Sequence, residues 1–106
     1  MKAIKNIVEG IRMELEGAER YAKHATEYKD TDRTLADAYA KAADSEMAVV
    51  DLLHAQAVRM IQTYQASGKG PVPAAMQAVW DWEHEKMIDT ITRIKTLLSV
   101  YRAPRQ

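Results

Sequence analysis

Apolar residues recur every three or four positions through three long stretches of this chain, a periodicity typical of amphipathic helices. The first stretch predicts a helix over residues 4–28. Its buried stripe comprises Ile4, Ile7, Ile11, Leu15, Ala18, Tyr21, Ala25 and Tyr28. Phenylalanine is absent, whereas alanine and methionine, which favour helices over strands, are frequent. The pattern therefore predicts an all-α fold.

The second stretch predicts a helix over residues 33–65 that carries two apolar faces. One face comprises Leu35, Ala38, Ala42, Val49, Leu53, Ala57 and Met60, and the other comprises Met47, Val50, Val58 and Ile61. Two apolar faces on one helix require two sets of neighbours. A helix of this length spans about 50 Å, which is long for a small monomer. We therefore expect a homo-oligomer, a dimer or larger.

Two short polar segments separate the predicted helices. Residues 29–32 offer good N-cap residues, and because the segment is short, the first two helices should form an antiparallel hairpin. The second segment, residues 67–73, ends at Pro73. Proline fits the first turn of a third helix, where its missing N–H is not needed. That helix is expected over residues 74–101, with residues 102–106 frayed. Its stripe comprises Met76, Val79, Met87, Ile91, Ile94, Leu98 and Tyr101, broadened by Trp80, Ile88 and Leu97.

Size and composition place limits on the partners of the chain. Its 106 residues suit one domain over 1–106, and 15 basic residues balance 15 acidic ones, so no global field attracts nucleic acid or anionic lipid. No stretch approaches the roughly 18 apolar residues of a membrane span, and the first residues lack a signal-peptide pattern. The absence of cysteine excludes disulfides and thiolate chemistry. We expect a cytoplasmic protein that binds neither nucleic acid nor membrane.

Three glutamates, Glu14, Glu46 and Glu83, fall inside the apolar stripes. Buried carboxylates are unfavourable unless they are paired or bound to a cation. A hairpin that folds near Asp30 sets residue 14 opposite residue 47, so Glu14 and Glu46 should lie at nearly the same depth. Facing carboxylates repel each other unless a proton or a metal lies between them. The alternative for each glutamate is a boundary position whose carboxylate reaches water.

A histidine adds to this set of candidate ligands. Asp51 and His54 are three residues apart on one helical face, which is a chelating spacing. A third helix that folds back near residue 70 places Glu83 opposite residue 57, nearer to His54 than to Glu46. The candidate metal ligands are therefore Glu14, Glu46, Glu83 and His54. The alternative for His54 is a partly exposed side chain paired with Asp51.

The glutamate positions carry a family resemblance. Residues 14–25, ELEGAERYAKHA, resemble the first helix of rubrerythrin and other ferritin-like proteins, where a ligand glutamate precedes a tyrosine by seven residues, as Glu14 precedes Tyr21. Residues 42–49, AADSEMAV, are similar to the second helix, which carries Glu-x-x-His; Glu46 matches, and Val49 replaces the histidine. Residues 82–85 are similar to the start of a third helix, and no fourth helix follows.

The resemblance implies a ferritin-like bundle completed by pairing two helical hairpins, with two Glu14/Glu46 pairs around a metal centre. It implies non-haem iron or manganese, held with Glu83 or His54 as further ligands, and oxidation of iron or reduction of peroxide. The alternative is a metal-free assembly module that keeps the bundle without this chemistry. A third hypothesis, a helical adaptor for another protein, differs only in whether an apolar groove stays open after self-association. The sequence leaves open whether the chain is an enzyme.

Overall fold

The computed structural model of the protein describes residues 2–68, 70 and 73–104, with only the backbone described at residues 75, 76 and 79. It contains three helices, α1 (Lys2–Tyr28), α2 (Arg33–Ala66) and α3 (Ala74–Arg102), and no strand lies within those residues. The predicted all-α class is confirmed, and each predicted helix end lies within two residues of the observed end. No described helix is apolar enough over a sufficient length to cross a membrane.

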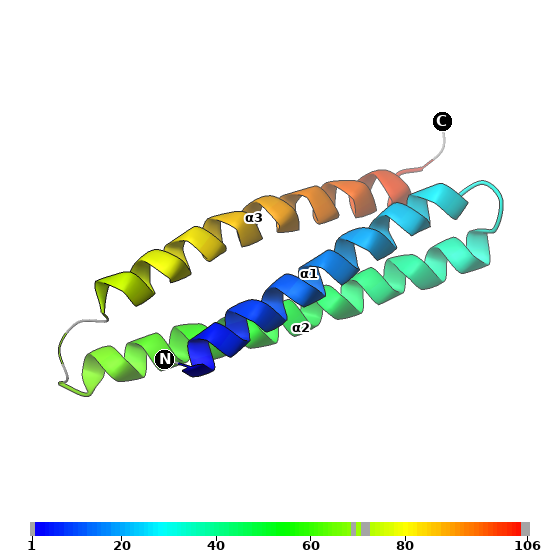
Figure 1. Ribbon diagram of the computed structural model, residues 1–106. Helices are drawn as coiled ribbons and strands as arrows, with labels where there is room; N and C mark the ends of the chain where they lie inside the picture. The colour runs from blue at the N-terminus through cyan, green and yellow to red at the C-terminus, as the bar shows by residue number, and fades with distance from the viewer. Residues whose placement is uncertain (1, 69, 71–72, 105–106) are drawn as a thin grey trace.

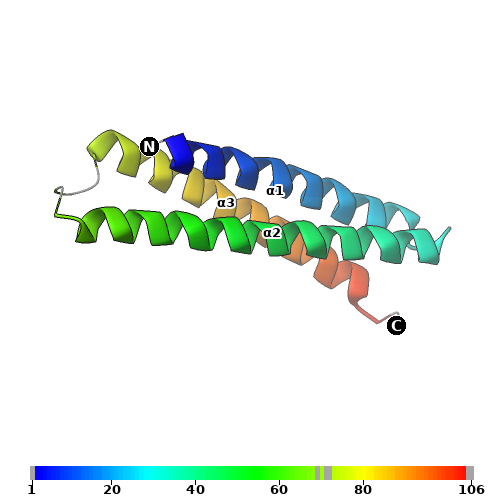
Figure 2. The same ribbon diagram turned by 90° about the horizontal axis from the view of Figure 1, so that it is seen from below.

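The helices form a rod with principal extents of 57 × 18 × 17 Å. The helices α1 and α2 are an antiparallel hairpin, and α3 runs in the same direction as α1 (Figure 1). The N-cap of α2 is Asp32, whose side chain accepts a hydrogen bond from the Leu35 N–H at 3.0 Å. The helix α1 packs against both other helices, whereas α2 and α3 contact each other little. Figure 2 shows that α3 is inclined to the hairpin.

Small residues line the contact between α1 and α2. Alanine has no side chain beyond Cβ, so helices that meet through alanines approach closely. The alanines buried in this seam are Ala18, Ala22 and Ala25 of α1 and Ala36, Ala40 and Ala43 of α2. Three large side chains of α3, Ile94, Leu98 and Tyr101, belong to the same core cluster. These three side chains of α3 therefore pack against the alanine-lined core of the hairpin.

The first predicted face of α2 was wrong in part. Leu35 and Val49 are 38% and 37% exposed, and Ala38 is also exposed. The buried residues of α2 are Ala36, Ala40, Ala43, Val50 and Ala57. Of these, Val50 belongs to the second predicted face and Ala57 to the first, whereas the other three belong to neither. The error arose because alanine contributes weakly to an apolar pattern, although its small size lets the two helices approach.

The predicted stripes of α1 and α3 are closer to the observed core. Five predicted residues of α1 are buried: Ile4, Ile11, Leu15, Ala18 and Ala25. Four predicted residues of α3 are buried: Met87, Ile94, Leu98 and Tyr101. Ile88, expected to broaden the stripe, is 49% exposed. The side chains of Met76 and Val79 lie outside the described part of the chain.

A polar cluster fastens the end of α3 to the start of α2. The ring of Tyr101 is buried, and its hydroxyl donates a hydrogen bond to Asp37. Arg33 lies over that ring at 4.9 Å and donates to Asp37 at 3.3 Å. Arg102, expected to be frayed, is instead the last helical residue and pairs with Asp44 at 2.6 Å. The hydrogen bond from Tyr101 lowers the pKa of Asp37, and burial raises the pKa of Tyr101.

Candidate functional site

Three contacts, spaced seven residues apart along both helices, define how α1 and α2 face each other. A Cβ atom on Gly10 would lie 3.2 Å from Leu53 Cδ1, and one on Gly17 would lie 3.3 Å from Glu46 Oε2. The ring centroids of His24 and Tyr39 are 5.0 Å apart. Seven residues are close to two turns of a helix, so the same edge of α1 meets the same edge of α2 each time.

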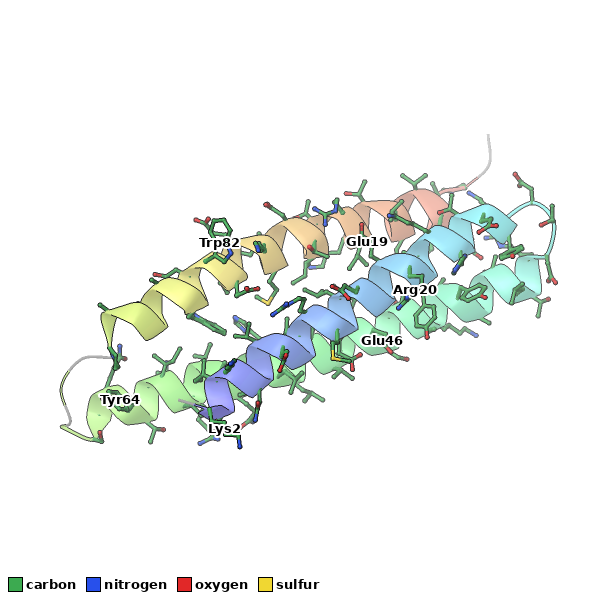
Figure 3. All side chains as sticks on the ribbon, in the orientation of Figure 1. Lys2, Glu19, Arg20, Glu46, Tyr64 and Trp82 are labelled. Carbon is green, nitrogen blue, oxygen red and sulfur yellow. The ribbon has the colours of Figure 1, made fainter. Side chains whose placement is uncertain are left out.

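The first two predicted ligands lie along this edge. Glu46 is half-buried, and its carboxylate rests against Gly17, which has no side chain to displace it. Figure 3 shows Glu46 where α1 passes over α2. Glu14 is also half-buried and precedes Gly17 by three residues, which is about 4.5 Å of helix rise. Glu14 and Glu46 thus differ in depth by less than one helical turn, and Gly17 is the residue that faces Glu46.

The other two predicted ligands lie elsewhere. His54 is half-buried and stacks against Trp80 and His84 of α3, with ring centroids 5.8 and 5.4 Å away. Glu83, the neighbour of His84, lines a cleft between α1 and α3. As expected, the start of α3 lies near His54. Eight residues separate Glu46 from His54, which places them about 12 Å apart along α2.

The four predicted ligands therefore do not converge within one chain. In the part of the chain that the structure describes, no three histidine, aspartate or glutamate side chains are grouped so that they could hold one metal ion. A di-iron site needs several carboxylate and imidazole ligands around each pair of ions. The described residues of a single copy do not bring that set together.

The cleft between α1 and α3 has a volume of about 280 Å³ and was not predicted from the sequence. Its apolar lining includes Val8, Ile11, Leu15, Trp80 and Met87. Its charged lining consists of Arg12, Lys86 and Arg93 with Glu16, Glu19 and Glu83. Arg93 donates to Glu19 at 3.4 Å, so part of this charge is neutralised internally. Equal numbers of opposite charges give the cleft no preference for an anion or a cation.

A second feature of the surface is an uncharged stripe along the outer side of α2, which we call the outer seam. Its members are spaced alternately by three and four residues, as in a coiled-coil seam. They are Leu35, Ala38, Ala42, Ser45, Val49, Leu52 and Gln56. Leu52 is 69% exposed, and of the seven only Ala42 is half-buried. Four members belong to the predicted first face, whereas Ser45, Leu52 and Gln56 were missed because two are polar and one lies off that face.

Comparison with protein-family models, with curated protein sequences and with solved structures gives no match for this chain. Two features of the structure bear on function: the outer seam of α2 and the carboxylate of Glu46 beside it.

Proposed function

We propose that this chain is an assembly module, a helical subunit that associates with a second copy of itself through the outer seam of α2. The observation that carries the proposal is the seam itself. It extends over residues 35–56 without a charged member, and most of its side chains are exposed. Apolar stripes with this spacing pack against another helix at a shallow crossing angle. In the described part of the chain neither α1 nor α3 covers the seam, which leaves it open to a partner from outside the chain.

The order of residues along the seam favours a second copy as that partner. The small members Ala38 and Ala42 lie in its first half, and the larger Val49 and Leu52 lie in its second half. If two copies pair antiparallel about Ser45, Ala42 of each lies opposite Val49 of the other, and Ala38 lies opposite Leu52. At these two pairs of positions large side chains meet small ones, as close packing requires.

The test uses two side chains of equal exposure. Leu52 on the seam and Met13 on α1 are each 69% exposed. Leu52→Glu places a charge inside the proposed interface, whereas Met13→Glu places one outside it. We expect light scattering to give a dimer mass for the native chain and for M13E, and a monomer mass for L52E with unchanged helical circular dichroism. A native chain that stays monomeric at all concentrations, or an L52E variant that stays dimeric, would contradict the proposal.

A second candidate function is metal binding at the dimer axis, and the position of Glu46 favours it. Glu46 follows Ser45, so antiparallel pairing about Ser45 brings the two Glu46 carboxylates close to the two-fold axis. Glu14 of each copy lies on α1, less than one helical turn from Glu46 in depth along the hairpin. The two Glu46 carboxylates beside the axis would need protons or cations between them, and the two Glu14 carboxylates lie at nearly the same level. Because Val49 replaces the histidine of the ferritin-like pattern, an oxygen-rich site results, and such sites suit manganese.

Glu46→Gln separates this candidate from a metal-free module. The protein, purified without chelator, is loaded anaerobically with ferrous iron or with manganese, and its metal content is measured by elemental mass spectrometry beside its mass in solution. Two ions per dimer that are lost in E46Q would support the metal centre. A dimer that stays metal-free, and whose melting temperature rises in E46Q as carboxylate repulsion is relieved, would leave the assembly module alone.

A further inference from the structure

Two histidines from different helices meet where the first part of α3 contacts α2. The ring centroids of His54 and His84 are 5.4 Å apart, and Trp80 lies 5.8 Å from the first and 5.6 Å from the second. Both histidines are half-buried, so the pair is partly open to solvent. His84 also lines the cleft between α1 and α3, which leaves space beside its ring.

We propose that His54 and His84 together bind a late first-row divalent ion such as Zn²⁺, Ni²⁺ or Cu²⁺. Imidazole nitrogen is a preferred ligand of these ions, with bonds of about 2.0–2.1 Å to zinc. Two imidazoles on one ion at a tetrahedral angle have ring centroids about 5 Å apart. The observed separation of 5.4 Å is close to this value. Because the two rings are stacked, their side chains must rotate to aim one nitrogen of each at the ion. Water supplies the remaining ligands, for which the cleft has room.

This site differs from the candidate centre at Glu46 in both position and chemistry. It lies about 12 Å farther along α2, and it lies within one chain. Among the described residues, no third histidine, aspartate or glutamate is placed to complete it. Two protein ligands give an exchangeable ion rather than the closed four-ligand arrangement of a structural zinc site. Since α2 and α3 contact each other little, the ion would tie together the two least connected helices.

Tryptophan fluorescence reports on this site directly. The chain has two tryptophans, and Trp82 is 61% exposed and points away from the hairpin on the far side of α3 (Figure 3). Trp82→Phe therefore leaves Trp80, which touches both histidines, as the one emitter. Untagged W82F protein is titrated with Cu²⁺ or Ni²⁺ at neutral pH, and Zn²⁺ is added as a competitor. We expect saturable quenching by one ion per chain that Zn²⁺ reverses.

Matched histidine variants in the W82F background decide the proposal. His54→Asn and His84→Asn should each weaken binding about tenfold or more. His24→Asn should leave binding unchanged. His24 belongs to α1 and lies near the start of α2, away from His54, where it contacts Glu27 and Tyr39. Zn²⁺ should raise the melting temperature of W82F and should not raise that of the H84N variant. Equal quenching in H54N, H84N and W82F, with circular dichroism showing all three folded, would overturn the proposal. The outcome does not depend on dimer formation, so it leaves the proposed function untouched.

Discussion

At the scale of single residues, Gly10 and Gly17 determine where side chains of α2 can rest on α1. Each glycine faces a side-chain end of α2: a methyl carbon of Leu53 at Gly10 and a carboxylate oxygen of Glu46 at Gly17. Glycine inside a helix is less stable than alanine by roughly 0.5–1 kcal/mol. At Gly17 the missing Cβ allows the half-buried carboxylate of Glu46 to lie against α1.

Gly17→Ala tests how firmly Glu46 is held. The new Cβ would lie 3.3 Å from Glu46 Oε2, which is the far end of a flexible, half-exposed side chain that can move aside. We expect the melting temperature to rise by about 2–6 °C, because the gain in helix propensity exceeds the cost of this displacement.

Gly10→Ala provides the comparison. Its Cβ would lie 3.2 Å from Leu53 Cδ1, and Leu53 packs against the main core cluster, so it has less freedom to move. The gain in melting temperature should therefore be smaller than in G17A. If G17A is the less stable of the two, the carboxylate of Glu46 is fixed by interactions other than its contact with Gly17.

At the scale of elements, α3 is joined to the hairpin mainly through its second half. Its described buried side chains begin at Met87 and end at Tyr101. Tyr101 combines a buried ring with the hydrogen bond to Asp37 at the start of α2. The buried side chains and the polar cluster thus both attach the second half of α3 to the hairpin.

Tyr101→Phe isolates the polar part of this attachment, because it keeps the ring and removes the hydroxyl. The hydrogen bond lowers the pKa of Asp37 below its ordinary 3.8. A lowered carboxyl pKa gives stability that is present above the ordinary pKa and is lost as pH falls through the lowered one. We expect Y101F to be less stable than the native chain at pH 7, with a smaller difference in acid. Urea unfolding at a series of pH values measures this.

The alkaline side gives an independent check on the same variant. Burial raises the pKa of Tyr101 above its ordinary 10.0, and the hydrogen bond to Asp37 adds to this rise. Stability from the neutral phenol is present below pH 10.0 and is lost as pH rises through the raised pKa. The native chain should therefore lose more stability above that pH than Y101F does. Parallel curves for the two proteins at both extremes would show that the hydroxyl is not coupled to Asp37.

At the scale of the whole molecule, the helices are unequally connected. The helix α1 packs against both neighbours, whereas α2 and α3 contact each other little. The first part of α3 is linked to α2 through the contacts of Trp80 and His84 with His54. A rod built in this way can open locally at one end while its other end stays packed.

Hydrogen exchange can detect this unequal stability. We expect amides of residues 80–86 to exchange faster than those of residues 91–101, because the described buried side chains of α3 lie at residue 87 and beyond. Zn²⁺ bound to His54 and His84 should slow exchange in residues 80–86 selectively. Equal protection along all of α3 in the absence of metal would show that its first part is held by contacts beyond those within one chain.

The sequence by itself determined the local structure of this protein. The three-to-four periodicity, the N-cap at Asp32 and the segment ending at Pro73 act over a few residues, so they located all three helices and the hairpin without knowledge of the packing. The depth of Glu46 relative to Glu14 followed from the loop position, because an antiparallel hairpin with a short loop has little choice of register.

Only the tertiary structure decided which sides of the helices meet. Ala36, Ala40 and Ala43 carry too little apolar area to stand out in a pattern, yet their small size brings α1 and α2 together and turns Leu35 and Val49 outward. The contact of His54 with His84 was likewise invisible, because it depends on how α3 lies across the hairpin. Periodicity reports the faces of one helix, whereas the choice among them depends on the shapes of two helices at once.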